Sequence, residues 1–163
     1  MKINVWLIYD TVRAAKNADY IDMHYQLAKE FGMRLKLLMD TEVESFLMSG
    51  ERPDICFMRT IRPLLSRRLE ENGICVLNPA FVSEICNDKG KTIQYIQENT
   101  VVPVIRTKRY KREQLSRELL LQNKDSVIKS VDGHGGRQVF LTSASYERLE
   151  KGIGTSDFIV QPS

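Results

Sequence analysis

Residues that could bind a polyphosphate gather towards the end of the sequence. A short apolar run at 127–131 carries one charged residue, Lys129, and a loop with three glycines in four positions follows it. The loop residues are Gly133, His134, Gly135, Gly136 and Arg137. Closely spaced glycines let main-chain N–H groups converge on one point, and the flanking cations add positive charge. The pattern is typical of a phosphate-binding loop and equally of a hairpin with a glycine tip.

Lys129 is the most informative of these residues. It lies between Ile128 and Val131 in a predicted strand, where a charged group costs burial energy unless it has a partner. His134, by contrast, is more often an incidental loop residue than a catalytic base.

Composition places the chain among soluble, cytoplasmic proteins. It has 163 residues, 42% hydrophobic and 28% charged, enough for one solid domain or two small ones. No apolar run approaches the roughly 20 residues of a membrane helix, and the N-terminal apolar segment is too short for a signal peptide. Three cysteines lie in apolar surroundings without a CxxC pair: Cys56, Cys75 and Cys86. We therefore expect buried thiols, with no metal site, disulfide framework or membrane partner.

The charge is mildly basic and unevenly distributed. The formal net charge is +3, but five cations fall within residues 106–112. Such a run could form a nucleic-acid-binding arm, although one short run beside a helix start is more often a solvated face. We expect no nucleic-acid partner and keep nucleic-acid binding as an alternative.

Residues 1–80 have the pattern of a small α/β domain. Apolar runs alternate with helical segments, and the expected strands are 2–9, 33–39, 55–58 and 74–77. The alternation predicts a parallel, helix-covered sheet, which binds ligands at the carboxyl ends of its strands. Arg59 and Arg62 lie just beyond the third strand, where they could meet a carboxylate or phosphate. Their interpretation as ordinary surface arginines is the commoner case and stays open.

Residues 81–163 follow a different pattern. Asp88 and Lys89 begin a helix through Asn99, and a further helix is expected at 113–122. Consecutive strands without long crossovers then predict an antiparallel sheet with helices on one face: 125–130, 137–141 and 158–160. Because the last strand comes so close to residue 163, we expect it at an open, unpaired edge of a truncated domain.

Short motifs succeed one another along nearly the whole sequence. They are Leu77-Asn78-Pro79, Cys86-Asn87-Asp88-Lys89 with Thr92 and Gln94, residues 102–107, the Lys129 strand, the glycine loop, and Ile159-Val160-Gln161. Each is weak alone, but their order and spacing resemble the N-terminal half of an ATP-grasp ligase, closest to the RimK-like and glutathione-synthetase-like branch. The resemblance implies a Rossmann-like parallel unit at 1–80 and an incomplete, antiparallel α+β first ATP-grasp lobe at 81–163.

The resemblance also implies a reaction and its participants. ATP-grasp ligases phosphorylate a carboxylate, and an amine or thiol then attacks the acylphosphate. Lys89 and Lys129 would hold the α- and β-phosphates. Residues 133–136 would supply a flap over the β- and γ-phosphates, with residues 132–137 mobile when no nucleotide is bound. Gln161 and Pro162 match the hinge whose main chain reads the adenine edge. The implied partners are ATP, Mg2+ and a small-molecule or peptide carboxylate, and a homo-oligomer is allowed.

The magnesium ligands of the family lie in the second half of its fold, together with an arginine for the transferred phosphoryl group. No such segment is recognised here, so catalytic residues and metal ligands are expected outside these residues, and the chain alone is expected to be nearly inactive. The alternative is a non-catalytic nucleotide-binding or interaction module, a truncated paralogue that pairs its open edge with a partner chain.

Overall fold

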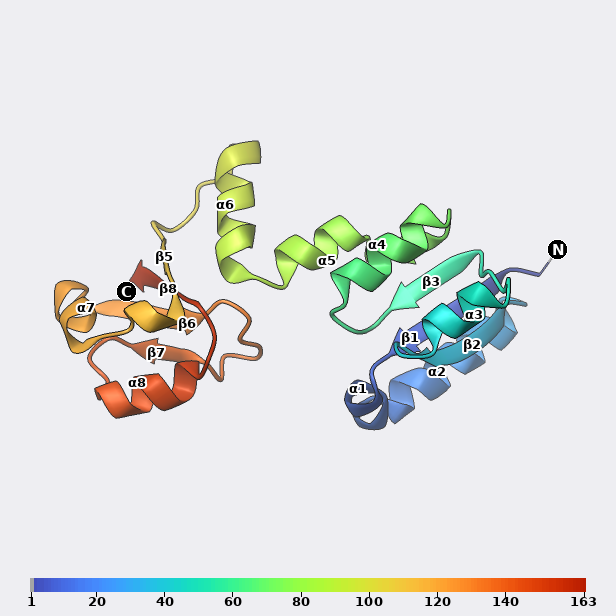
Figure 1. Cartoon of the computed structure of the whole chain (residues 1–163), viewed down its shortest axis with the longest axis horizontal. Coiled ribbons are helices and arrows are strands. Elements are labelled where there is room, and N and C mark those ends of the chain that lie inside the picture. The colour runs from blue at the N-terminus through green and yellow to red at the C-terminus, as the bar shows by residue number, and fades with distance from the viewer. Residues whose placement is uncertain (1) are drawn as a thin grey trace. The chain divides into compact units, whose positions relative to one another are not determined.

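The computed structural model describes residues 2–163, which form two compact units (Figure 1). Unit 1 ends at Glu84 and unit 2 begins at Ile85. This division and the sequence-based boundary at residue 80 both lie in helix α5 (Ala80–Cys86). No helix within residues 2–163 has the length and apolar character needed to cross a membrane.

Within the described residues, unit 1 contains a four-stranded sheet in the order β2-β1-β3-β4, with every neighbouring pair parallel. Its strands are β1 (Asn4–Tyr9), β2 (Arg34–Met39), β3 (Ile55–Met58) and β4 (Cys75–Leu77). The helices between them are α1 (Thr11–Lys16), α2 (Ala18–Glu30), α3 (Val43–Met48) and α4 (Pro63–Glu71). The predicted parallel sheet is confirmed.

Helices cover both faces of this sheet. Trp6 and Ile8 of β1 pack in one core with side chains of α3 and α4. Leu7 and Tyr9 lie in a second core with Ile21 of α2. Alternate residues of β1 therefore enter two cores, which explains its unbroken apolar sequence.

Two short helices of unit 1, α1 and α3, were not predicted from the sequence. Helix α1 buries none of its residues, so it has no apolar periodicity to detect. Its start is fixed by Asp10, whose carboxylate accepts a hydrogen bond from the main chain of Arg13 at 2.8 Å. The next helix begins at Ala18, before Asp19.

The cysteines differ from the expectation of three buried thiols. All three are free, but Cys75 and Cys86 are exposed, and that expectation is wrong for these two. On β4 the side chain of Val76 is buried, so the neighbouring Cys75 points outward. Cys56 is fully buried, and burial raises its thiol pKa to about 12.

Within the described residues, unit 2 contains a four-stranded sheet in the order β5-β8-β6-β7, with every neighbouring pair antiparallel as predicted. Its strands are β5 (Lys108–Tyr110), β6 (Ser126–Ser130), β7 (Val139–Leu141) and β8 (Phe158–Pro162). Its helices are α6 (Lys89–Asn99), the 3-10 turn η1 (Arg112–Gln114), α7 (Arg117–Gln122) and α8 (Tyr146–Ile153).

The final strand, β8, is not an edge of the sheet. It pairs with β5 on one side and β6 on the other, and its residues 158–161 are buried. The expectation of an open final edge is therefore wrong. The partner that sequence reasoning missed is β5, which lies inside the basic run 106–112 and is too short to show an alternating pattern.

The predicted helix at 113–122 is also shorter than expected. The 3-10 turn η1 precedes it, and α7 begins only at Arg117. Ser116 sets this start, because its hydroxyl accepts a hydrogen bond from the main chain of Leu119 at 3.1 Å.

The two faces of the unit 2 sheet differ. Ile128 and Val160 pack with side chains of α7 and α8, and we call this the closed face. Residues directly opposite each other in paired strands share a face, and Lys129 lies opposite Ile159 on β8 and Val139 on β7. These three residues therefore belong to the other face, which we call the open face.

Candidate functional site

A cavity of about 470 Å³ lies on the open face of unit 2, beside α6. Its lining residues are Cys86, Lys89, Thr92, Ile93, Lys129, Val139, Ile159 and Gln161. The size falls within the range of roughly 300–1,000 Å³ that is usual for small-molecule sites. The lining combines aliphatic side chains with two ammonium groups, so it suits a ligand with a flat apolar part and several negative charges.

Lys129 is held in this cavity by a chain of hydrogen bonds. Its Nζ donates to Oε1 of Gln161 at 2.7 Å, and Nε2 of Gln161 donates to Oγ1 of Thr107 at 2.8 Å. Gln161 is only 6% exposed, so these bonds satisfy both ends of a buried amide. The partner that a lysine in this strand requires is therefore Gln161.

Lys89 enters the same cavity from the first position of α6. Asp88 caps this helix by accepting a hydrogen bond from the main chain of Lys91 at 2.9 Å. The main-chain N–H of Lys89 donates to the carbonyl of Val131 at 2.9 Å, which ties the helix start to the end of β6. A helix and a strand far apart in the sequence thus place Lys89 and Lys129 around one cavity.

The electrostatics of Lys89 reflect this crowding. Its Nζ donates a hydrogen bond to the main-chain oxygen of Gly133. Partial burial lowers the pKa of Lys89, and the charge of Lys129 lowers it further, while Asp132 and Asp88 oppose the shift. A polyanionic ligand would relieve the repulsion between the two ammonium groups.

Hydrogen bonds hold the glycine loop between β6 and β7 at its N-terminal end, at Asp132. The carboxylate of Asp132 accepts hydrogen bonds from the hydroxyl groups of Ser130 and Ser156, the latter at 3.0 Å. Partial burial alone would raise the pKa of Asp132, but these hydrogen bonds and the charge of Lys89 lower it overall. These hydrogen bonds hold the start of the loop at Asp132, where mobility without nucleotide stays a prediction.

The tip of the loop, residues 134–137, is exposed. Gly135 and Gly136 have φ angles of 62° and 72°, in the left-handed region that favours glycine. The second leg is held where Nε2 of Gln138 donates to the carbonyl of Gly152 at 3.1 Å. Hydrogen bonds thus hold both ends of the loop, and its glycine-containing tip is exposed. Mobility of the tip stays a prediction.

No protein-family model matches this sequence, and no curated protein matches it. Solved structures do match. D-alanine–D-alanine ligase from Bacillus anthracis, complexed with ATP, has a TM-score of 0.70 and 14% identity, covering 100% of this chain and 57% of that one. N5-carboxyaminoimidazole synthetase from Staphylococcus aureus, complexed with ADP, has a TM-score of 0.68 and 12% identity, covering 100% and 48%. A RimK domain ATP-grasp protein from Sphaerobacter thermophilus has a TM-score of 0.64 and 16% identity, covering 98% and 63%.

The fold is that of ATP-grasp ligases. The chain spans between 48% and 63% of the length of these three proteins. The likeness confirms the resemblance to ATP-grasp ligases and the predicted fold class, a parallel sheet unit followed by an antiparallel α+β unit, while closeness to the RimK-like branch stays a prediction.

Within this ATP-grasp fold, several predicted site residues come together. Lys89, Lys129 and Gln161 line one cavity, and Gly133 joins them through its bond to Lys89. The exposed loop tip contains His134, Gly135, Gly136 and Arg137. Pro162 follows Gln161 at the exposed end of β8.

The two arginines predicted near a substrate lie in unit 1, just beyond β3. Nη1 of Arg62 is 3.2 Å from the carboxylate of Asp40, whose side chain is only 7% exposed. This pairing gives Arg62 a structural role, since Asp40 is nearly buried. Arg59 is exposed and is the better candidate to meet an anion.

Sequence reasoning missed the aliphatic half of the cavity. Ile159 and Val139 join it because they lie opposite Lys129 in neighbouring strands, and Ile93 joins it from α6. Alternation along β8 from Gln161 back to Ile159 was the available signal. The pairing of β8 with β6 was the missing information.

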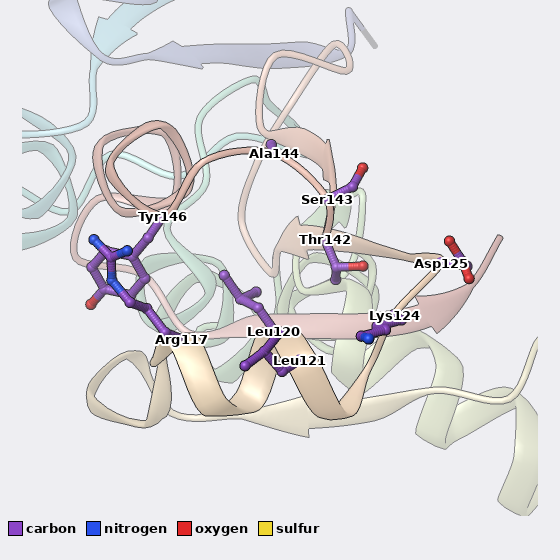
Figure 2. Close-up of a pocket in the computed structure, with 9 residues that line it drawn as sticks. All are labelled: Arg117, Leu120, Leu121, Lys124, Asp125, Thr142, Ser143, Ala144 and Tyr146. Carbon is purple, nitrogen blue, oxygen red and sulfur yellow. The ribbon is translucent and has the colours of Figure 1, made fainter.

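Figure 2 shows a second cavity in unit 2, of about 490 Å³, between α7 and the segment after β7. Arg117 lies over the ring of Tyr146, 5.4 Å from its centroid, and its Nη2 is 2.6 Å from a carboxylate oxygen of Glu147. Lys124 and Asp125, which carry opposite charges, complete the lining at the other end. Because carboxylates accompany both cations, this cavity is the poorer match for a polyphosphate despite its greater volume.

Residues 2–163 contain no group of three or more His, Cys, Asp or Glu side chains that could hold a metal ion. Mg2+ in nucleotide sites is usually held by one or two carboxylates together with the phosphates and water. Metal ligands elsewhere in a complete enzyme stay a prediction.

Proposed function

We propose that unit 2 binds ATP in the open-face cavity, as the nucleotide-binding part of an ATP-dependent ligase. The observation that carries this proposal is the meeting of Lys89 and Lys129 in one aliphatic-lined cavity beside a glycine loop. The solved structures with this fold include one complexed with ATP and several with ADP. The proposal transfers that ligand class to this chain.

Each part of the lining suits a part of ATP. The ammonium groups of Lys89 and Lys129 would hold the α- and β-phosphates, and the main-chain N–H groups of residues 133–137 would close over the outer phosphates. Ile93, Val139 and Ile159 offer an apolar surface for the adenine ring. At the adenine edge, the main chain of Gln161 would donate or accept hydrogen bonds, and the carbonyl of Pro162, which has no N–H, would accept one.

The proposed reaction joins a carboxylate to an amine or thiol. The γ-phosphoryl group moves from ATP to a carboxylate oxygen, ADP leaves, and the nucleophile then displaces phosphate from the acylphosphate. Arg59 is proposed to attract the carboxylate substrate, and Arg62, which is half-exposed and paired with Asp40, is proposed to add positive charge beside it. We place this chemistry in the cytoplasm, with Mg2+ ligands outside residues 2–163, and include a homo-oligomer as an assembly that light scattering would detect.

Two observations weigh against the alternative functions, although a non-catalytic nucleotide-binding module would use the same cavity. A module that pairs through an open final strand required β8 at an edge, but β8 is central. A nucleic-acid-binding arm would use the cations of the basic run, and two of the five, Arg109 and Lys111, form ion pairs with Asp157, Arg109 also with Asp88.

Isothermal titration calorimetry with ATP and Mg2+ tests the proposal. Lys129→Ala should weaken ATP binding by at least about tenfold, because a charge-assisted hydrogen bond contributes roughly 1.5–3 kcal/mol. Lys124→Ala is the matched control, since it removes a lysine from the second cavity of the same unit. Equal losses in both variants, or no ATP binding by the wild type, would overturn the proposal.

A further inference from the structure

We propose that Arg109 is a positioning residue that fixes Lys89 for the phosphates, an inference that rests on the ATP site proposed above. Arg109 lies on the edge strand β5, in the run that sequence analysis assigned to a solvated face. It pairs with Ile159 across the strands, so its side chain leaves the sheet on the open face. This direction brings it to the first turn of α6.

Both terminal nitrogens of the Arg109 guanidinium group donate hydrogen bonds to Asp88, the N-cap residue of α6. Nη1 is 3.1 Å from Oδ1 of Asp88, and Nη2 is 3.0 Å from Oδ2. Two parallel bonds from a planar fork restrict the orientation of the carboxylate more than one bond would. The same Asp88 accepts the main-chain N–H of Lys91, so a fixed carboxylate means a fixed first turn.

Glycine at position 90 supports a close approach between this guanidinium and the helix. A Cβ atom at Gly90 would lie 3.0 Å from Nη1 of Arg109 and 3.2 Å from Oδ1 of Asp88, tighter than ordinary van der Waals contact. Glycine is a poor helix former, so its presence in the first turn of α6 needs a reason. Room for the Arg109–Asp88 pair supplies that reason.

Lys89 occupies the first position of this clamped turn. Its main-chain N–H is held by Val131, and its side chain points to the cavity and to the carbonyl of Gly133. Arg109 is itself occupied, since Nη2 also lies 3.4 Å from Oδ2 of Asp157. Arg109 therefore acts on a nucleotide through the position of Lys89.

Lys111 provides a matched control on the same segment. Its Nζ is 3.1 Å from Oδ2 of Asp157, which is also a partner of Arg109. Arg109 has Asp88 as a further partner, and this contact with the cap of α6 is what the comparison isolates. Both cations form partly exposed ion pairs, with side chains 39% and 66% exposed. Loss of either is expected to leave the unfolding midpoint in urea nearly unchanged.

A double-mutant cycle on ATP affinity tests the inference. Arg109→Ala should weaken ATP binding about twofold to threefold, and Lys111→Ala should leave it unchanged. In the Lys89→Ala background, Arg109→Ala should cause no further loss, because the residue that it positions is gone. A full further loss in that background would show a direct contact or a general structural effect, and would overturn the inference.

Amide NMR without nucleotide gives a second readout that does not depend on the proposed function. Arg109→Ala should move the amide signals of Gly90 and Lys91, and Lys111→Ala should leave them in place. Unmoved signals in Arg109→Ala would overturn the positioning role. Moved signals together with a wild type that fails to bind ATP would confirm the clamp and refute the ATP site.

Discussion

The two sheets of this chain differ in how many of their faces are covered by helices in an apolar core. In unit 1 the parallel sheet carries helices on both faces, and the central strand β1 sends alternate residues into two cores. In unit 2 the antiparallel sheet buries the closed face under α7 and α8, and its open face lines a cavity with two lysines. A covered sheet leaves only strand ends for polar chemistry, whereas a half-covered sheet can place charged groups on a strand's own face.

The polar residues at the strand ends of unit 1 largely satisfy one another. Asp10, after β1, accepts hydrogen bonds from Arg13 and from the hydroxyl of Thr60, which follows β3. Asp40, after β2, pairs with Arg62. On the open face of unit 2, by contrast, two cations share a cavity, and so the candidate ligand site lies there.

The closed and open faces of unit 2 should differ most in the stability that they contribute. Ile128→Ala, on the closed face, should lower the free energy of unfolding of unit 2 by about 3 kcal/mol, because it leaves a cavity in the core. Val139→Ala, on the open face, removes a side chain that is 41% exposed and should lower it by less than about 1 kcal/mol. Urea titration followed by amide NMR signals of unit 2 measures both, and equal losses would remove the distinction between the faces.

The strand-end network of unit 1 should show itself in the dependence of stability on pH. Hydrogen bonds from Arg13 are the main cause that lowers the pKa of Asp10 to about 2, from an ordinary 3.8. A lowered folded-state pKa adds stability above the ordinary value, and that stability is lost as the pH falls through the lowered one. Asp10→Asn should therefore destabilise unit 1 by about 1 kcal/mol at neutral pH, after allowance for solvent screening.

Fluorescence of Trp6 reports this change, because it is the one tryptophan of the sequence and lies in a core of unit 1. The stabilities of the wild type and Asp10→Asn should converge as the pH falls from 3.8 towards 2. A difference that is independent of pH would mean that the charge of Asp10 contributes nothing, and would leave the strand-end network without an electrostatic role.

The open face should show its own, smaller pH dependence in ligand affinity. Partial burial lowers the pKa of Lys89 below the ordinary 10.5. ATP binding uses the protonated amine, so affinity should fall by about threefold as the pH rises through the lowered pKa. Lys89→Arg should remove this dependence, since arginine stays charged, and calorimetry across alkaline pH would measure it. An unchanged profile in Lys89→Arg would assign the dependence to another group.

Much of the fold was predictable because its signals are local. Strands β1 and β3 of unit 1 are almost wholly apolar, and the parallel sheet follows from the alternation of strands with helices. Lys129 stood out because a single charge interrupts an apolar strand. Asp88 and Lys89 stood out because a capping residue marks the helix start.

What could not be predicted depends on contacts between distant segments. Strand β5 has only three residues, two of them basic, so its sequence gives no signal for a strand. It is recognised only by its pairing with β8, in which Lys108 lies opposite Val160. The role of Arg109 required Asp88, which is 21 residues away, and the aliphatic lining required the register of β6 against β8. From the sequence, Lys89 and Lys129 could be assigned to one site only through the family resemblance. In the structure, both side chains line the same cavity.

Amide NMR of the chain during titration with ATP and Mg2+ shows which surface of the protein the nucleotide contacts. If ATP binds on the open face of unit 2, the perturbed signals will include Thr92, Ile93 and Lys129, together with the loop at 133–137. Signals at Lys124 and Leu121, in the second cavity, will stay in place. Perturbation confined to the second cavity or to unit 1, or no perturbation at all, would mean that ATP does not bind on the open face.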